Sequence, residues 1–244
     1  TGNLDGRTVN RTSVRIDRRG QYASRTAVAD PNAVTIGDYA GDIHTWVSAI
    51  CQQTGASCVR VPGHSEGGLV ALEAGQNPAS ICGLILIATP GRPLGSVLRE
   101  QLRSNPANAP IRDRGLAVIA DLEAGKRVDK DKIPAAFLPL LRPAVQGFLI
   151  GIFALDPAAL IAACREPVLI PQGREDIQIG VVDAERLAHA DPAAKLVLLP
   201  DTNHVLKVVT SSDRAENRAT ESDPELPLAP GVVDAISGFV GGAR

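Results

Sequence analysis

The feature that most constrains the fold is an unbroken apolar run, Cys82–Ala88, with the sequence CGLILIA. A short run without polar alternation is typical of a strand that is buried on both faces of a parallel sheet. Four other short aliphatic runs alternate with longer stretches of helical periodicity, so we predict a doubly wound, mostly parallel α/β fold with helices on both faces. The other predicted strands are Ser13–Asp17, Cys58–Pro62, Pro167–Pro171 and Lys195–Leu199.

One long stretch, residues 91–166, breaks this alternation. It contains no convincing strand and reads as several helices punctuated by prolines. We interpret it as a helical insertion between the strand that ends near 88 and the strand that starts near 167, placed at the C-terminal edge of the sheet, where a lid would lie. The predicted division is therefore a core of 1–90 and 167–244 with a cap of 91–166. A helical subdomain without a gating role is the alternative.

Charge and composition exclude some classes of partner. The chain has 244 residues with 25 basic and 27 acidic side chains, a net charge of −2, so there is no basic footprint for nucleic acid. No uninterrupted apolar run reaches the roughly 18 residues of a membrane span. We therefore expect a small-molecule substrate and neither a nucleic acid nor a membrane-spanning segment. The oligomeric state is not readable from the sequence.

The four cysteines, Cys51, Cys58, Cys82 and Cys164, form no CxxC pair, and no histidine lies at zinc-ligand spacing from them. We expect no metal and no cofactor. An even count favours two disulfides over four buried thiols. We predict the pairs 51–58 and 82–164, because the first would close a short loop and the second would join the starts of neighbouring strands. Disulfides would indicate a periplasmic or secreted protein of bacterial type.

The strongest motif is Gly63-His64-Ser65-Glu66-Gly67-Gly68, which follows a predicted strand and precedes a predicted helix. This G-x-S-x-G pattern in that context predicts a nucleophile elbow, a sharp turn that holds the Ser65 hydroxyl clear of the sheet edge. Gly63 and Gly67 would be small because side chains there would collide with the neighbouring strand and helix. The Glu66 N–H, at the start of the helix, would supply half of an oxyanion hole. An incidental Gly-rich turn is the alternative.

A serine nucleophile needs a base, and the chain offers four histidines. His44 lies within a predicted helix, His64 adjoins the nucleophile on a turn that points neighbours apart, and His189 lies on a surface helix. His204 follows the last strand and so lies at the same sheet edge as Ser65. We predict that His204 is the base.

The third member should be a carboxylate that orients the imidazole, after a strand and between the serine and the histidine in the chain. Asp176 follows the strand Pro167–Pro171 in the loop Gln172-Gly173-Arg174-Glu175-Asp176 and is the best candidate. Glu175 is the rival. Asp183, in a helix, and Asp201, close to the histidine in sequence, are weaker.

Three segments resemble a known family: Arg15-Ile16-Asp17-Arg18-Arg19-Gly20, the elbow motif, and Thr202-Asn203-His204. With Ser65, Asp176 and His204 in that chain order, the sequence resembles the α/β-hydrolase superfamily from Ser13 to the C-terminus, and within it the bacterial serine-aminopeptidase-like (S33) and esterase branch. The resemblance implies a doubly wound sheet, a helical cap, and hydrolysis of an ester or related acyl bond without a cofactor.

The N-terminal part departs from that family, which has roughly three more strands and a helix before the RIDRRG segment. Only 12 residues precede the first predicted strand here, and the chain has no methionine at all. We therefore expect that N-terminal strands are missing from this sequence, along with the loop that donates the second oxyanion-hole N–H. Thr1–Gly6 resembles a remnant of that loop.

The function that the sequence predicts is a carboxylesterase-like serine hydrolase (EC 3.1.1) that cleaves a small carboxylic ester through an acyl-enzyme. Two alternatives stay open. One is a non-catalytic or fragmentary binding domain with this fold, and the other is an acyltransferase or peptidase that uses the same triad.

Overall fold

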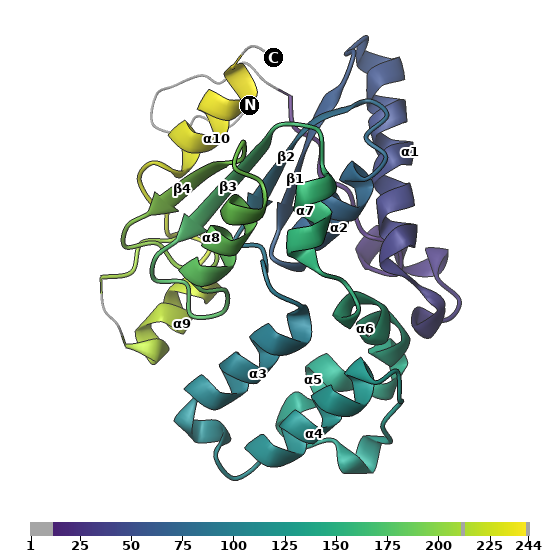
Figure 1. The fold of residues 1–244 in the computed structure, drawn as a ribbon, viewed down its shortest axis with the longest axis vertical. Coiled ribbons are helices and arrows are strands. Elements are labelled where there is room, and N and C mark those ends of the chain that lie inside the picture. Colours follow the sequence, from purple (N-terminus) through teal and green to yellow (C-terminus); the bar gives the residue numbers. More distant parts are fainter. Residues whose placement is uncertain (1–11, 211–212, 243–244) are drawn as a thin grey trace.

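The computed structural model describes residues 12–210 and 213–242 (Figure 1). The interpretation of Thr1–Gly6 lies outside these residues. At the centre is a parallel sheet of four strands in the order β1-β2-β3-β4. Four of the five predicted strands are thus confirmed. They are β1 (Val59–His64), β2 (Ile81–Ile87), β3 (Val168–Gly173) and β4 (Lys195–Leu199).

Helices lie on both faces of the sheet. Successive residues of a strand face opposite sides of the sheet, so the contacts of two neighbouring residues in β2 identify the helices on each side. In β2, an added Cβ at Gly83 would meet Phe239, which lies on α10. The next residue, Leu84, approaches Gly75 of α2. Helices α1 and α7 contact α2, and α8 contacts α7, so these helices lie on the same side of the sheet as α2. The doubly wound arrangement is confirmed. The helices are α1 (Ile36–Thr54), α2 (Glu66–Gly75), α3 (Leu94–Ser104), α4 (Arg112–Glu123), α5 (Leu138–Leu141), α6 (Gln146–Phe153), α7 (Pro157–Ala163), α8 (Val181–Ala190), α9 (Arg214–Ser222) and α10 (Val232–Gly241).

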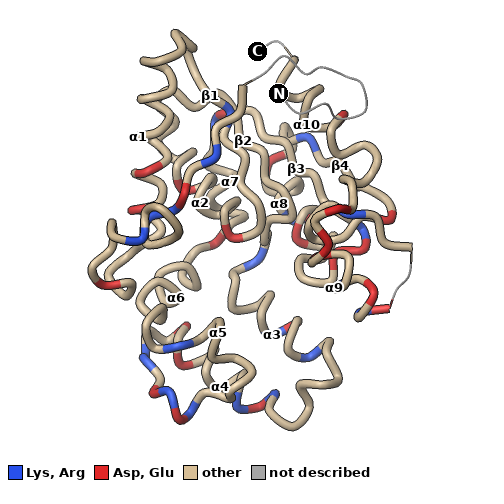
Figure 2. Tube along the Cα trace, turned by 180° about the vertical axis from the view of Figure 1, so that it is seen from behind, with Lys and Arg blue, Asp and Glu red and all other residues tan. Residues whose placement is uncertain are grey.

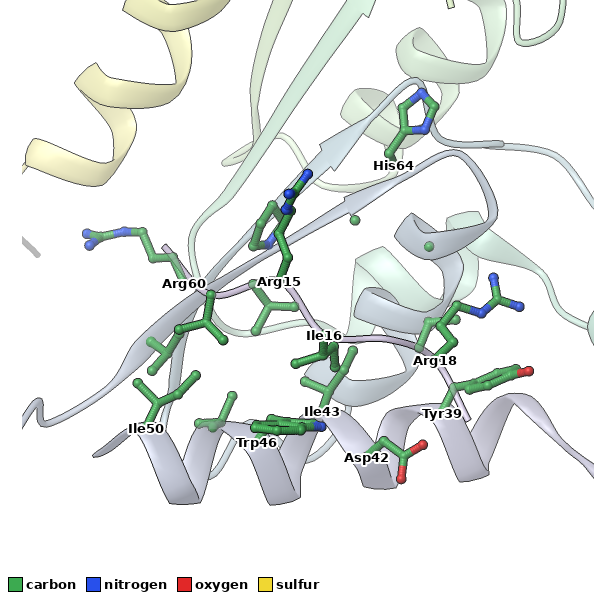
Figure 3. A pocket seen from close by; sticks show the side chains of 18 of the residues that line it. Arg15, Ile16, Arg18, Tyr39, Asp42, Ile43, Trp46, Ile50, Arg60 and His64 are labelled. Atoms are coloured by element: carbon green, nitrogen blue, oxygen red, sulfur yellow. The ribbon is translucent and has the colours of Figure 1, made fainter. Parts of the chain in front are cut away.

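The predicted strand Ser13–Asp17 is wrong, since this segment has no strand pairing. A cavity of about 400 Å³ separates residues 14–18 from β1 and α1. In Figure 3, Ile43, Trp46 and Ile50 extend from α1 toward this segment, and His64 lies at the far end of β1. The segment runs along this cavity without joining the sheet.

The segment 91–166 contains helices and no strand, as predicted. Helices α3 to α6 gather beyond the ends toward which the strands point (Figure 1). Its last helix, α7, instead contacts α2 and α8 and so belongs to the layer that covers the sheet. The predicted division into a core and a cap stays a prediction, as does any gating role.

Residues 135–153 have the length and the mean hydropathy, 1.6, of a membrane-crossing helix, although only 28% of the stretch is buried. In the structure they are not one continuous helix. Two 3₁₀ turns, α5 and α6 divide the stretch, and the chain is extended at Arg142, before Pro143. Length and composition alone are weak evidence for a span, so the expectation that none exists stays a prediction.

The predicted disulfide pairs are wrong. One disulfide joins Cys58 to Cys82, with 5.6 Å between their Cα atoms. Parallel pairing sets Val59 of β1 opposite Ile81 of β2, so the two cysteines lie at the same end of neighbouring strands. Cys51 and Cys164 are free thiols, each partly buried.

Basic and acidic positions are interspersed over the described chain (Figure 2). Several charged pairs join different segments of the chain, such as Arg99 of α3 with Glu123 of α4 and Arg19 with Asp42 of α1. The expectation that the protein binds no nucleic acid stays a prediction.

Candidate active site

Ser65 lies on a strained turn between β1 and α2. Its backbone has φ 55° and ψ −122°, a conformation that non-glycine residues rarely adopt and that is concentrated at functional sites. Two backbone hydrogen bonds hold the turn: the Ser65 N–H donates to Ile87 O at 2.8 Å, and the Gly68 N–H donates to Ser65 O at 2.9 Å. The strand–turn–helix context predicted for the G-x-S-x-G motif is therefore present.

Tight packing explains two of the glycines in the motif. An added Cβ at Gly63 would lie 2.2 Å from Gly67 O, so strand and helix approach each other too closely for a side chain. The steric need predicted for Gly67 is wrong, because a Cβ there would meet no described atom within 4 Å. Gly67 lines the cavity beside β1 instead. The residue that must lack a side chain is instead Gly68, where a Cβ would lie 2.0 Å from Thr89 Oγ1.

Glu66 is the first residue of α2, where a backbone N–H has no acceptor within the helix. Its side chain is engaged elsewhere, since Glu66 Oε1 accepts a hydrogen bond from Arg18 Nη1 at 2.7 Å. The Arg18 guanidinium also stacks over the ring of Tyr39, 4.5 Å from its centroid. The RIDRRG segment thus packs against the elbow helix through an ion pair.

Asp176 follows β3 and holds a fully bonded carboxylate. Its Oδ1 accepts from the backbone N–H groups of Gln178 and Ile179, both at 2.8 Å. Its Oδ2 accepts from His204 Nδ1 at 2.8 Å and from Gln172 Nε2 at 3.2 Å. Four donors satisfy the carboxylate in a site where its side chain has no exposed surface.

His204 lies in the loop after β4, and the pairing of β3 with β4 brings it to Asp176. Beyond the last ladder pair, Gly173 with Leu199, the strands remain joined because Glu175 N–H donates to Thr202 O at 2.9 Å. The His204 side chain is only 6% exposed. A bond from Nδ1 to a buried carboxylate fixes the ring so that Nε2 is the nitrogen left for other partners.

His64 is a site residue that the sequence reasoning set aside. Its Nε2 hydrogen-bonds to the carbonyl oxygen of His204 at 2.8 Å, and the centroids of the two rings are 4.7 Å apart. The pKa of His64 is lowered, mainly because surrounding groups remove water from the ring, although the residue as a whole stays exposed. Since His64 directly precedes Ser65, this contact ties the elbow to the loop that carries His204.

Two buried amide side chains brace the acid loop and were also missed. Gln172, the polar residue within β3, donates to Asp176 and to the carbonyl oxygens of Gly173 and Ile179. Asn217 on α9 donates to Glu175 O at 2.7 Å. Gln172 was predicted to lie in the loop after Pro171, whereas β3 extends to Gly173 and includes it. Asn217 gave no signal in the sequence, because its partner lies 42 residues away.

The rival candidates lie outside this cluster. Asp183 is buried on α8 and forms an ion pair with Arg92 at 2.7 Å. Asp201 and His189 are exposed, as expected for His189. Glu175 contributes its backbone to the loop, while the carboxylate that contacts His204 is that of Asp176.

No group of three or more His, Cys, Asp or Glu side chains within residues 12–210 and 213–242 is arranged to hold a metal ion. Those described side chains instead bring together one carboxylate, one imidazole and a strained serine turn. Such a set can transfer protons and activate a hydroxyl group.

Several known proteins are similar to this chain. It is 26% identical over 194 residues to the esterase EstD of Thermotoga maritima, a match that covers 76% of this chain and 45% of that protein. The chain thus spans less than half the length of this curated relative. Among solved structures, an esterase from Thermogutta terrifontis has 18% identity and a TM-score of 0.47, covering 85% of this chain and 72% of that one. Rv0554 of Mycobacterium tuberculosis has 20% identity and a TM-score of 0.46, covering 84% and 76%.

The family described as the alpha/beta hydrolase family matches residues 3–216. This match spans the strands, the elbow and the loops that carry Asp176 and His204. The chain belongs to the α/β hydrolase family.

Proposed function

We propose that this protein is a serine hydrolase that cleaves small carboxylic esters. The observation that carries the proposal is the buried 2.8 Å hydrogen bond between His204 Nδ1 and Asp176 Oδ2, beside the strained turn that presents Ser65. This is the acid–base pair that a serine nucleophile requires. The esterase named among the relatives favours an ester over other acyl substrates.

In the proposed reaction, His204 Nε2 accepts the Ser65 hydroxyl proton as the oxygen attacks the ester carbonyl. Asp176 orients the ring and stabilises the imidazolium that forms. The Glu66 N–H donates to the developing oxyanion, and the N-terminal end of α2 adds a favourable dipole. The alcohol leaves with the proton from His204, and water activated by the same base releases the acyl group.

A labelling experiment tests this proposal. We expect a fluorophosphonate probe to label Ser65, and we expect Ser65→Ala protein to be neither labelled nor active on p-nitrophenyl butyrate. A wild-type protein that resists the probe and hydrolyses no p-nitrophenyl ester would contradict it and favour a binding domain with this fold. Product analysis with added alcohols and peptides separates hydrolysis from acyl transfer and peptidase activity, including that of the S33 branch.

A periplasmic or secreted location is part of the same proposal. The Cys58–Cys82 disulfide supports it, because disulfides persist in oxidising compartments. Fractionation of the native host, with an antibody against this chain, tests it.

A further inference from the structure

A second cavity, of about 570 Å³, lies between the helical segment 94–141 and α9. Its size is within the range of small-molecule sites. One wall comes from α3, α4 and the turn around α5. It contributes apolar side chains, including Leu102, Ile119 and Phe137, together with the polar side chains of Gln101, Asn105 and Asn108. The opposite wall is polar and comes from α9.

The polar wall presents two arginines. Arg214 and Arg218 lie four residues apart on α9, so they share one helix face, and both line the cavity. Within the described residues, neither guanidinium forms an ion pair or a side-chain hydrogen bond. The Nε atom of Arg214 is buried without a partner. A buried donor without a partner costs free energy, which a ligand with acceptor oxygens would recover.

Glu221 is the one acidic residue on the lining and does not neutralise these arginines. Its Oε1 accepts from Gln178 Nε2 at 3.1 Å. The lining therefore carries two positive charges and one negative charge, a net charge of +1. That balance suits a single carboxylate better than a phosphate dianion.

The cavity also touches the loop that carries Asp176. Ile177 and Gln178, which line it, directly follow Asp176 in the chain, and the Gln178 N–H donates to Asp176 Oδ1. Gln101 of α3 donates to Gln178 O at 2.8 Å from the opposite side. A ligand here would lie against the loop that orients His204.

We propose that this cavity binds the free carboxylate of a dicarboxylic acid half-ester, with Arg214 and Arg218 on the carboxylate and the apolar side chains of the opposite wall against its methylene chain. This inference rests on the proposed esterase function and names its substrate class. Guanidinium groups bind carboxylates through paired hydrogen bonds, and such charge-assisted bonds are among the stronger ones in proteins.

Matched ester pairs test the inference. p-Nitrophenyl monoesters of succinate, adipate and suberate are compared with neutral butyrate, hexanoate and octanoate esters. We expect wild-type protein to favour the charged ester in kcat/KM at one or more chain lengths. Arg214→Gln/Arg218→Gln protein should lower that charged-to-neutral ratio by about tenfold or more, as expected for lost charged hydrogen bonds. Arg186→Gln, an exposed arginine on α8, is the matched control and should leave the ratio unchanged.

A binding measurement separates this inference from the proposed function. Suberate is titrated calorimetrically into Ser65→Ala protein, which needs no activity, and into the same protein with both arginines replaced. We expect saturable binding that the arginine replacements abolish. Absent binding, or binding that survives the replacements, would overturn the carboxylate site even if esters are hydrolysed. Suberate binding without hydrolysis of any ester by wild-type protein would instead retain the site and reject the esterase function.

Discussion

His64 and His204 form a pair of rings tilted by 50°, in which the Nε2 atom of His64 lies 2.8 Å from the carbonyl oxygen of His204. The contact holds the backbone of the residue that is proposed to act as the base. Its geometry requires His64 to keep a proton on Nε2, which the neutral ring can do when Nδ1 is unprotonated.

Replacing His64 with phenylalanine should keep a ring against His204 but remove the hydrogen bond. We expect kcat on p-nitrophenyl butyrate to fall about 3- to 10-fold with little change in KM, as one lost hydrogen bond implies. Steady-state kinetics measure the separate effects on kcat and KM. His64→Gln, whose amide can donate to the same carbonyl, should recover most of the rate, and His189→Phe is the exposed control. A rise in KM at constant kcat would assign His64 to substrate binding instead.

The lowered pKa of His64 makes stability depend on pH. Below its ordinary value of about 6.5 the unfolded chain binds a proton on this residue more readily than the folded chain does. Wild-type stability should therefore fall as the pH drops through 6.5, and the loss should level off below the folded pKa. His64→Gln lacks this contribution, so its free energy of unfolding relative to wild type should improve between pH 7.5 and 5. Urea unfolding at both pH values measures it, and a constant difference would contradict the assignment.

Asp176 and Glu175 give a matched pair of acidic variants. Asp176→Asn should lower kcat by about 10⁴-fold, because an amide stabilises neither the correct tautomer nor the imidazolium. Glu175→Gln should leave kcat nearly unchanged, since its described role in the loop is through the backbone. Circular dichroism checks that both variants fold. Equal losses in the two variants would reject the assignment of Asp176.

The disulfide predicts a thiol count and a stability effect. Titration of the denatured protein without reductant should find two thiols, from Cys51 and Cys164, and four would contradict the Cys58–Cys82 bond. Cys58→Ser should lower the free energy of unfolding by about 2–4 kcal/mol. Cys51→Ser is the control, because it removes no cross-link.

Local chemistry made much of the fold predictable. The buried run around Leu84 specified a central strand, which the structure contains as β2. Position after a strand, together with chain order, selected Asp176 and His204, and the structure brings them into contact. These predictions depended on patterns within single segments or on the order of segments.

The predictions that were wrong or missing concern features that depend on residues far away in the sequence. The Cys58–Cys82 bond follows from the register of β1 against β2, which composition does not encode. The segment 13–17 has a strand-like sequence, but a strand also needs a hydrogen-bonded neighbour. Helix α9 escaped prediction because its sequence is polar, and its contribution is a set of contacts to loops far away in the chain.

The ion pair between Arg92 and Asp183 has a consequence for engineering. Asp183 also accepts the backbone N–H groups of Gly91 and Arg92, so the first residues of the helical segment are bonded to α8 of the sheet layer. An exchange of this segment for that of another hydrolase should therefore be spliced after Arg92. A junction placed before Gly91 would remove Arg92 and leave the Asp183 carboxylate, which has no exposed surface, without its ion-pair partner. The chimaera would then carry an uncompensated buried charge.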